Sequence, residues 1–163
     1  MNAPTQMPTD NDPLRFERWR PVLADSVQEV FSMMVGAQVV IPDQEPSLIS
    51  EVTGMVGLAG ELCGVLCVRC SKDAASKIAS HMLGIPVTEA DQHRSDSVGE
   101  ICNMVAGNFK AKIDGLQDKC MLSVPTVITG EDYQFHSLAV GKRIEIGFIF
   151  EGEPLWIGLE LRS

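Results

Sequence analysis

Apolar and polar residues recur with two different periods along this chain, and the change of period predicts the order of its elements. Between residues 13 and 36 apolar side chains return every three or four positions, as on one face of a helix. Pro21 must either kink this segment or begin its main helix. Residues 48–58 and 62–70 instead carry apolar runs of strand length, separated by residues 59–61. The opening of the chain therefore predicts a helix followed by a hairpin.

The rest of the chain repeats the order of helix followed by strands, with more elements of each kind. Residues 72–83 predict a short amphipathic helix that ends at Gly84. Thr88 and Asp91 form a Ser/Thr-x-x-acidic start for a longer helix, whose pattern runs to about residue 115. Strand candidates follow at residues 121–128, 133–140, 143–150 and 155–161.

These elements predict one α+β domain over residues 13–163. Long helices should pack on a largely antiparallel β-sheet, and each half of the chain reads as a helix followed by strands, which gives two pseudo-symmetric halves. Residues 1–12 are polar and predict a flexible tail.

A twelve-residue motif occurs twice, 71 positions apart, and supports the division into halves. Residues 25–36 align without gaps on residues 96–107, with six of the twelve positions identical. The second copy carries Asn103 where the first carries Ser32. Duplication of one unit, followed by loss of a site in the first copy, is the simplest explanation.

The second copy predicts a helix with one polar and one apolar side. At about 100° per residue, four of its residues fall within roughly 60° of one another. These are Asp96, Glu100, Asn103 and Gly107. The opposite side carries Val98, Cys102, Val105, Phe109 and Ile113. The second helix therefore presents a carboxylate and a carboxamide one turn apart.

Charge narrows the class of partner. The chain has 163 residues and a formal net charge of -9, which disfavours nucleic acid and anionic membrane surfaces because these bind clustered Lys and Arg. No apolar run reaches the roughly 18 residues of a membrane span, and the first residues lack the pattern of a signal peptide. We expect a cytoplasmic protein whose partner is a protein or a small molecule.

The cysteines and histidines do not predict a metal site. Cys63 and Cys67 would point to one side of a strand and Cys70 to the other, so the three cannot bind one ion. In the cytoplasm such thiols stay reduced and pack as small apolar residues. The histidines, at positions 81, 93 and 136, lack the spacing of metal ligands.

The pattern Asp96-x3-Glu100-x2-Asn103, followed 22 positions later by Pro125, resembles the CheC/CheX/FliY phosphatases of bacterial chemotaxis, and CheX-like members most closely. Residues 49–57, 98–107 and 124–130 also stand in the order that CheX-like domains show. The resemblance covers roughly residues 14–163.

This resemblance implies hydrolysis of the aspartyl phosphate on a response-regulator receiver domain such as CheY. Glu100 would pair with a lysine of the receiver, and Asn103 would orient the attacking water. Asp96 and Gly107 would contact the partner. The resemblance further implies a homodimer and no cofactor of its own, with Mg²⁺ expected in the receiver's active site. Because Ser32 is too short to replace Asn103, the first helix is expected to be structural or a secondary contact surface.

Four alternatives stay open at this point. Ser26 with Glu29, and Ser97 with Glu100, match a capping box, which would turn each Glu back onto the helix start. Gly36 and Gly107 could instead permit packing of the two helices on each other. The whole domain could also be a non-catalytic module that docks on receivers or acts as a signalling adaptor. A metal- or thiol-dependent enzyme has the least support.

Overall fold

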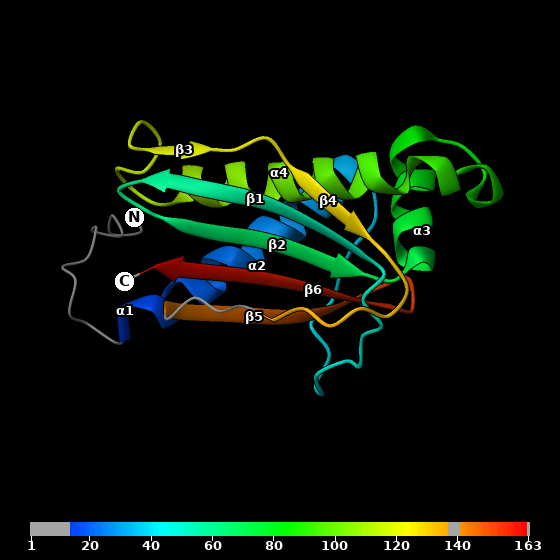
Figure 1. The fold of residues 1–163 in the computed structure, drawn as a ribbon, viewed down its shortest axis with the longest axis horizontal. Helices are drawn as coiled ribbons and strands as arrows, with labels where there is room; N and C mark the ends of the chain where they lie inside the picture. The colour runs from blue at the N-terminus through cyan, green and yellow to red at the C-terminus, as the bar shows by residue number, and fades with distance from the viewer. Residues whose placement is uncertain (1–13, 137–140, 163) are drawn as a thin grey trace.

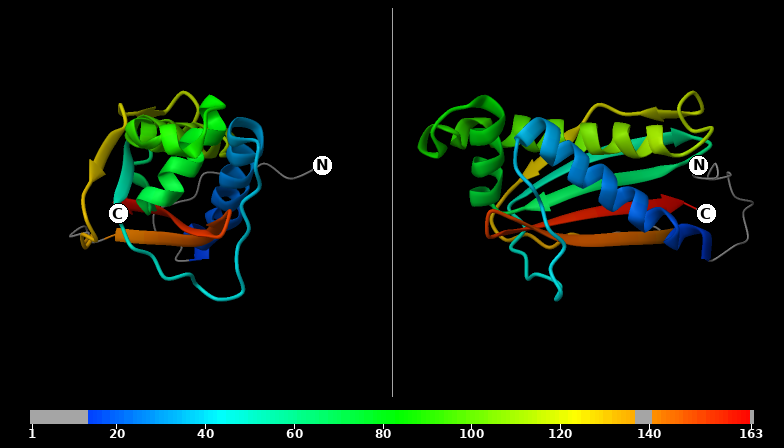
Figure 2. Two further views of the ribbon diagram at one scale, coloured as in Figure 1. Left: turned by 90° about the vertical axis from the view of Figure 1, so that its right-hand side faces the viewer. Right: turned by 180° about the vertical axis from the view of Figure 1, so that it is seen from behind.

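The computed structural model describes residues 14–136 and 141–162, and in this part of the chain one antiparallel sheet has a layer of helices on one face (Figures 1 and 2). The helices are α1 (Leu14–Glu17), α2 (Trp19–Val30), α3 (Lys72–Leu83) and α4 (Arg94–Lys112), with a π-helical turn η1 (Phe31–Val35) after α2 and the 3₁₀ turns η2 (Val87–Glu89) and η3 (Asp91–His93) before α4. The strands are β1 (Val52–Gly60), β2 (Gly64–Cys70), β3 (Cys120–Leu122), β4 (Thr126–Thr129), β5 (Gly141–Phe150) and β6 (Glu153–Arg162).

The sheet has the order β3-β1-β2-β6-β5, and β4 also pairs with β1, next to β3. Two hairpins, β1–β2 and β5–β6, meet through an antiparallel β2–β6 ladder. The helix that precedes each hairpin contacts the other hairpin: α2 packs against β5, and α4 packs against β1 and β2. The expected α+β fold with two pseudo-symmetric halves is confirmed.

The core lies between the sheet and the helical layer. Alternate residues of β2 face the helices, so that Leu66, Val68 and Cys70 are completely buried. The apolar side predicted for the second motif copy is buried against them. Its members are Val98, Cys102, Val105, Phe109 and Ile113. The remaining sides of α4 face α2, α3, the β3–β4 edge and solvent.

The helix of the second motif copy starts later than its sequence predicts, at Arg94 rather than Thr88. Two 3₁₀ turns replace its expected beginning because side-chain contacts fix the chain there. Ser76 of α3 donates a hydrogen bond to Asp91 Oδ1 (3.0 Å), and Arg94 Nε donates to Ser76 Oγ (2.6 Å). The helix also ends at Lys112, short of residue 115.

The first helical segment breaks at Arg18, and Pro21 is the third residue of α2. In the first turn of a helix the missing N–H of proline costs no hydrogen bond, so Pro21 neither kinks α2 nor stands at its first position. The predicted hairpin forms, although β1 begins at Val52 rather than at residue 48.

The strand predicted over residues 121–128 is divided. Pro125 has no N–H to donate, and the Ser123 hydroxyl instead accepts the Gly57 N–H at 2.8 Å. The chain is therefore bent between β3 and β4. The strand predicted over residues 133–140 is not formed at residues 133–136, where the Tyr133 hydroxyl bonds to Thr53 on the outer face of the sheet. Residues 137–140 lie outside the described residues, as do residues 1–12 of the predicted tail.

The last two predicted strands are present and form the longest hairpin of the described chain. Their turn is shorter than residues 151–154, the gap between the two predicted strands, because β6 already begins at Glu153. Glu151 and Gly152 both have positive φ, and pairing of β5 with β6 begins at once on either side of them.

Candidate functional site

The second motif copy lies within α4, and its polar side is accessible. Asp96 and Glu100 are exposed, and Asn103 and Gly107 are half-buried. Figure 2 (right) shows the helical layer from its solvent side, with α4 and α2 lying on the same face of the sheet. α4 therefore places a carboxylate and a carboxamide where a second protein can reach both.

The capping alternative for Glu100 is wrong. α4 begins at Arg94, so Ser97 is already inside the helix and is buried, and His93 at the N-cap makes no side-chain cap. Within residues 14–136 and 141–162, the Glu100 and Asn103 side chains make no hydrogen bond or ion pair. Both side chains are therefore free to act on a partner.

The two motif glycines serve different purposes. A methyl group added at Gly107 would meet no atom within 4 Å, so this glycine is not needed for packing of α4 on α2. Gly36 has φ +72° and ends the π-helical turn, with its N–H donating to Phe31 O at 2.9 Å. The interpretation that both glycines permit helix packing is therefore wrong.

The first motif copy is held against the second. The Glu29 carboxylate accepts hydrogen bonds from Lys112 Nζ (2.7 Å) and Asn108 Nδ2 (3.1 Å), both on α4. Both hydrogen bonds lower the pKa of Glu29, and the bond from Lys112 has the larger effect. Ser26 lies inside α2 and donates to Val22 O, so Glu29 is not part of a capping box either. The sequence motif alone gave no signal for this contact, because Asn108 and Lys112 lie beyond the repeat.

A shallow hollow of about 400 Å³ marks the polar face of the first copy. It is lined by Asp25, Gln28, Glu29, Ser32, Gln38 and Val39. Ser32 belongs to the π-helical turn, in which each residue advances the helix by a smaller angle than in an α-helix. The two copies therefore differ in backbone shape as well as in the residue that replaces Asn103.

On its other flank α4 lies against the β3–β4 edge. A methyl group added at Gly99 would approach Val127 Cγ2 at 3.1 Å and Pro125 Cβ at 3.6 Å. The absence of a side chain at Gly99 thus lets the bend between β3 and β4 lie close to the helix. The short sequence Ser-Val-Pro predicts a local irregularity, but it does not show that this irregularity borders the residue before Glu100.

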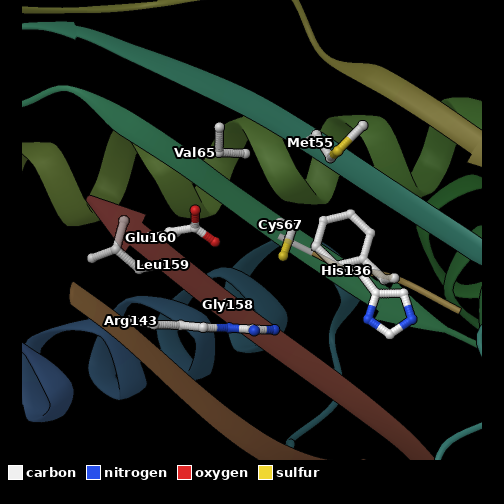
Figure 3. A pocket seen from close by; sticks show the side chains of 9 residues that line it. Met55, Val65, Cys67, His136, Arg143, Gly158, Leu159 and Glu160 are labelled. Atoms are coloured by element: carbon white, nitrogen blue, oxygen red, sulfur yellow. The ribbon is translucent and has the colours of Figure 1, made fainter. Parts of the chain in front are cut away.

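The outer face of the sheet carries a separate pocket of about 250 Å³. Figure 3 shows Cys67 of β2 in this pocket, with Arg143 of β5 and Glu160 of β6 beside it. Burial raises the pKa of the Cys67 thiol, which disfavours the nucleophilic thiolate. His136 bonds to Gln134 within the same loop. This pocket is on the face of the sheet opposite to α4.

Three further buried cysteines show the same trend. Burial raises the pKa of Cys70 to about 12 and also raises the pKa values of Cys102 and Cys120. In the part of the chain that the structure describes, no three His, Cys, Asp or Glu side chains are grouped as metal ligands. None of the described helices combines the length and apolar character that crossing a bilayer requires.

Comparison with known proteins relates this chain to one family. Residues 52–148 match the family described as chemotaxis phosphatase CheX. A curated relative, the CheY-P phosphatase CheX of Thermotoga maritima, is 27% identical over 126 residues, which are 73% of this chain and 81% of that protein. The matched residues include the whole of α4 and Pro125.

Solved structures share the fold. A putative chemotaxis protein from Desulfovibrio vulgaris Hildenborough superposes with a TM-score of 0.77 at 21% identity, over 89% of this chain and 97% of that one. A chain of the CheX-CheY-BeF3-Mg²⁺ complex from Borrelia burgdorferi gives a TM-score of 0.71 at 20% identity, over 89% and 98% of the two chains.

Proposed function

The chain belongs to the CheX family of chemotaxis phosphatases, and from this premise we propose that it accelerates hydrolysis of the aspartyl phosphate on a CheY-like receiver domain. Glu100 and Asn103 are the pair that acts in this reaction. The observation that carries the proposal is the accessible polar side of α4, on which both side chains lie without partners among the described residues. The Thermotoga relative is named as a CheY-P phosphatase, and the Borrelia complex joins CheX to CheY.

Asn103 has the chemistry to orient water. An acyl phosphate is a mixed anhydride and is already activated, so the helper protein needs to hold a water molecule in line with the phosphorus atom rather than supply a nucleophile. The carboxamide can donate one hydrogen bond and accept another. It is also neutral, whereas a carboxylate at this position would repel the anionic phosphoryl group.

Glu100 has the chemistry to fix the receiver in register. Its carboxylate lies one helical turn before Asn103 on the same side of α4, about 60° away around the axis. An ion pair with a receiver lysine would hold the amide at the phosphoryl group. Asp96 and Gly107, at the two ends of this side, would complete the contact. Mg²⁺ belongs to the receiver in this proposal, and this chain holds no cofactor of its own.

The test is the decay of radiolabelled aspartyl phosphate on receiver domains in the presence of Mg²⁺. We expect the wild-type protein to accelerate decay and the Asn103→Ala and Glu100→Ala variants to lose about a hundredfold of that acceleration, because misplaced water costs this much. Neither side chain makes a hydrogen bond or ion pair with the residues that the structure describes, so the free energy of unfolding should change by no more than about 0.5 kcal/mol. Full activity in both variants would contradict the assignment.

A second candidate function is a docking module that binds receivers without hydrolysing the phosphate. The degenerate first copy favours this reading for α2, where Ser32 replaces Asn103 and Glu29 is bound to α4. Binding of a receiver without any acceleration of decay would support the docking function for the whole chain. The presence of Asn103 on α4 favours the phosphatase.

The resemblance to CheX-like proteins extends the proposal to the assembly and its location. We place the protein in the cytoplasm, as a homodimer that acts on a phosphorylated receiver. Residues 13–163 would form the phosphatase domain, preceded by residues 1–12 as an N-terminal tail.

A further inference from the structure

We propose that Val124 is an apolar anchor for the receiver domain, held beside the polar side of α4 by the bend between β3 and β4. This inference rests on the proposed function and adds a contact to it. The bend, defined as Ser123, Val124 and Pro125, separates the two strands that pair with β1.

The bend is fixed by hydrogen bonds rather than left as a loose connection. Ser123 N donates to Gly57 O at 2.9 Å, and Gly57 N donates to Ser123 Oγ at 2.8 Å. The same hydroxyl donates to Val124 O at 3.0 Å. These bonds replace the ladder that Pro125 cannot continue, and they hold the backbone on both sides of the Val124 side chain.

The bend also lies against the working side of α4. Pro125 is next to Gly99, where an added Cβ would stand 3.6 Å from Pro125 Cβ. Asn103 is only about 40° around the helix from Gly99, on the side that faces the strands. We expect a partner that reaches the Asn103 amide to cover the adjoining bend as well. Figure 1 shows β3 and β4 running alongside α4.

Val124 is available for such a contact. It is 84% exposed, the largest exposed fraction among the large hydrophobic residues of the described chain. A single exposed valine is ordinary in itself. This one is held in place by a fixed backbone, so its burial by a partner would cost little conformational entropy. Side chains that become fully desolvated and well packed near the centre of a contact supply a large share of interface affinity.

Charge explains why an apolar anchor is needed here. The chain has a net charge of -9, and Asp96 and Glu100 add carboxylates to the contact face. A phosphorylated receiver site is also anionic, so long-range electrostatic attraction contributes little to the encounter. Affinity must then come from burial of apolar surface next to the site, and Val124 is the side chain placed for it.

The test compares Val124→Ser with Val40→Ser. Val40 is also exposed, but it pairs with Ile149 at the opposite edge of the sheet. In the phosphatase assay we expect Val124→Ser to raise KM about tenfold with kcat within twofold of wild type, because about one buried valine is lost from the interface. Val124→Ile should keep the wild-type KM, and Val40→Ser should change neither constant.

Binding to a receiver loaded with BeF3 and Mg²⁺ separates this inference from the phosphatase assignment. Val124→Ser should weaken that binding about tenfold whether or not the wild-type protein accelerates phosphate decay. Unchanged KM and unchanged binding in Val124→Ser, or an equal loss in Val40→Ser, would overturn the anchor. No binding of wild type to any loaded receiver would overturn it too, whereas binding without hydrolysis would overturn only the phosphatase.

Discussion

Glu29 and Glu100 occupy the same position in the two motif copies, yet their surroundings give them different roles. The Glu29 carboxylate is bound to Lys112 and Asn108 of α4, whereas the Glu100 carboxylate is exposed and has no such partner among the described residues. Residue type alone therefore does not distinguish the two copies, whereas the contacts of each carboxylate do.

The two motif glycines should respond in opposite directions to alanine. At Gly107 the added methyl group has free space, and alanine should raise the free energy of unfolding by about 0.5–1 kcal/mol because it favours the helix. At Gly36 the φ of +72° disfavours a side chain, and alanine should lower it by about 1 kcal/mol. Urea denaturation of both variants measures the two changes, and a shift of the same sign in both would contradict the distinction.

Glu29→Gln should make the protein less sensitive to acid. Hydrogen bonds from Lys112 and Asn108 hold the pKa of Glu29 below its ordinary value of 4.5. A carboxyl with a lowered folded pKa adds stability above its unfolded pKa and loses that contribution as the pH falls through the folded pKa. Wild type should therefore be more stable than Glu29→Gln at neutral pH, and the difference should vanish in acid.

The measurement is the urea midpoint of wild type and Glu29→Gln from neutral pH down to values below 4.5, the ordinary pKa of glutamate. Lys112→Met is the matched control: it removes the largest cause of the lowered pKa and should show a reduced pH dependence, while the hydrogen bond from Asn108 to Glu29 remains. A constant difference between wild type and Glu29→Gln at every pH would contradict the assignment of the pKa shift to these contacts.

At the scale of elements, the two motif copies differ in the backbone geometry at matching positions, Ser32 in the first copy and Asn103 in the second. In α4 the α-helix continues without interruption past Asn103, whereas in α2 it gives way to the π-helical turn before Ser32. We therefore expect that adding Ser32→Asn to the Asn103→Ala variant will not restore phosphatase activity. The amide would stand on a different backbone, and its companion Glu29 is already bound.

The check is the aspartyl-phosphate decay assay on the double variant, with Asn103→Ala alone for comparison. Recovery of activity in the double variant would show that the π-helical turn does not prevent a second working site.

Element types were predicted from the pattern of apolar residues more successfully than element boundaries. The buried side of α4 and the final hairpin follow from periodicity, because a core selects one face of each element. The later start of α4 depends on Ser76, which lies in another helix, and the division of β3 from β4 depends on Gly57. Such contacts between distant residues leave no local pattern in the sequence.

At the scale of the whole molecule, the sequence predicted which side of α4 is polar but not what borders it. The spacing of Asp96, Glu100 and Asn103 predicts one exposed side, and the structure shows these residues accessible. Pro125 was recognisable only as part of a family pattern, and its contact with Gly99 needed the packed fold. The flanks of a site are set by tertiary packing, which local spacing does not encode.

The proposed homodimer is open to a direct measurement. Light scattering of the purified protein should give twice the 17.7 kDa mass of one chain. This expectation comes from the likeness to CheX-like proteins. A mass of one chain at concentrations where phosphate decay is accelerated would show that the monomer is the active form.

The crossed packing of the two halves determines how the chain can fold. α2 covers the hairpin of the second half and α4 covers that of the first, so neither half closes a hydrophobic core by itself. The halves must fold together in one cooperative transition, with many contacts between residues distant in sequence. By the same reasoning, an ancestor of half this length could have buried its helix only against a second copy of itself. On this account, fusion of two copies would free one of them from selection at its polar face, while its helix would stay indispensable to the fold.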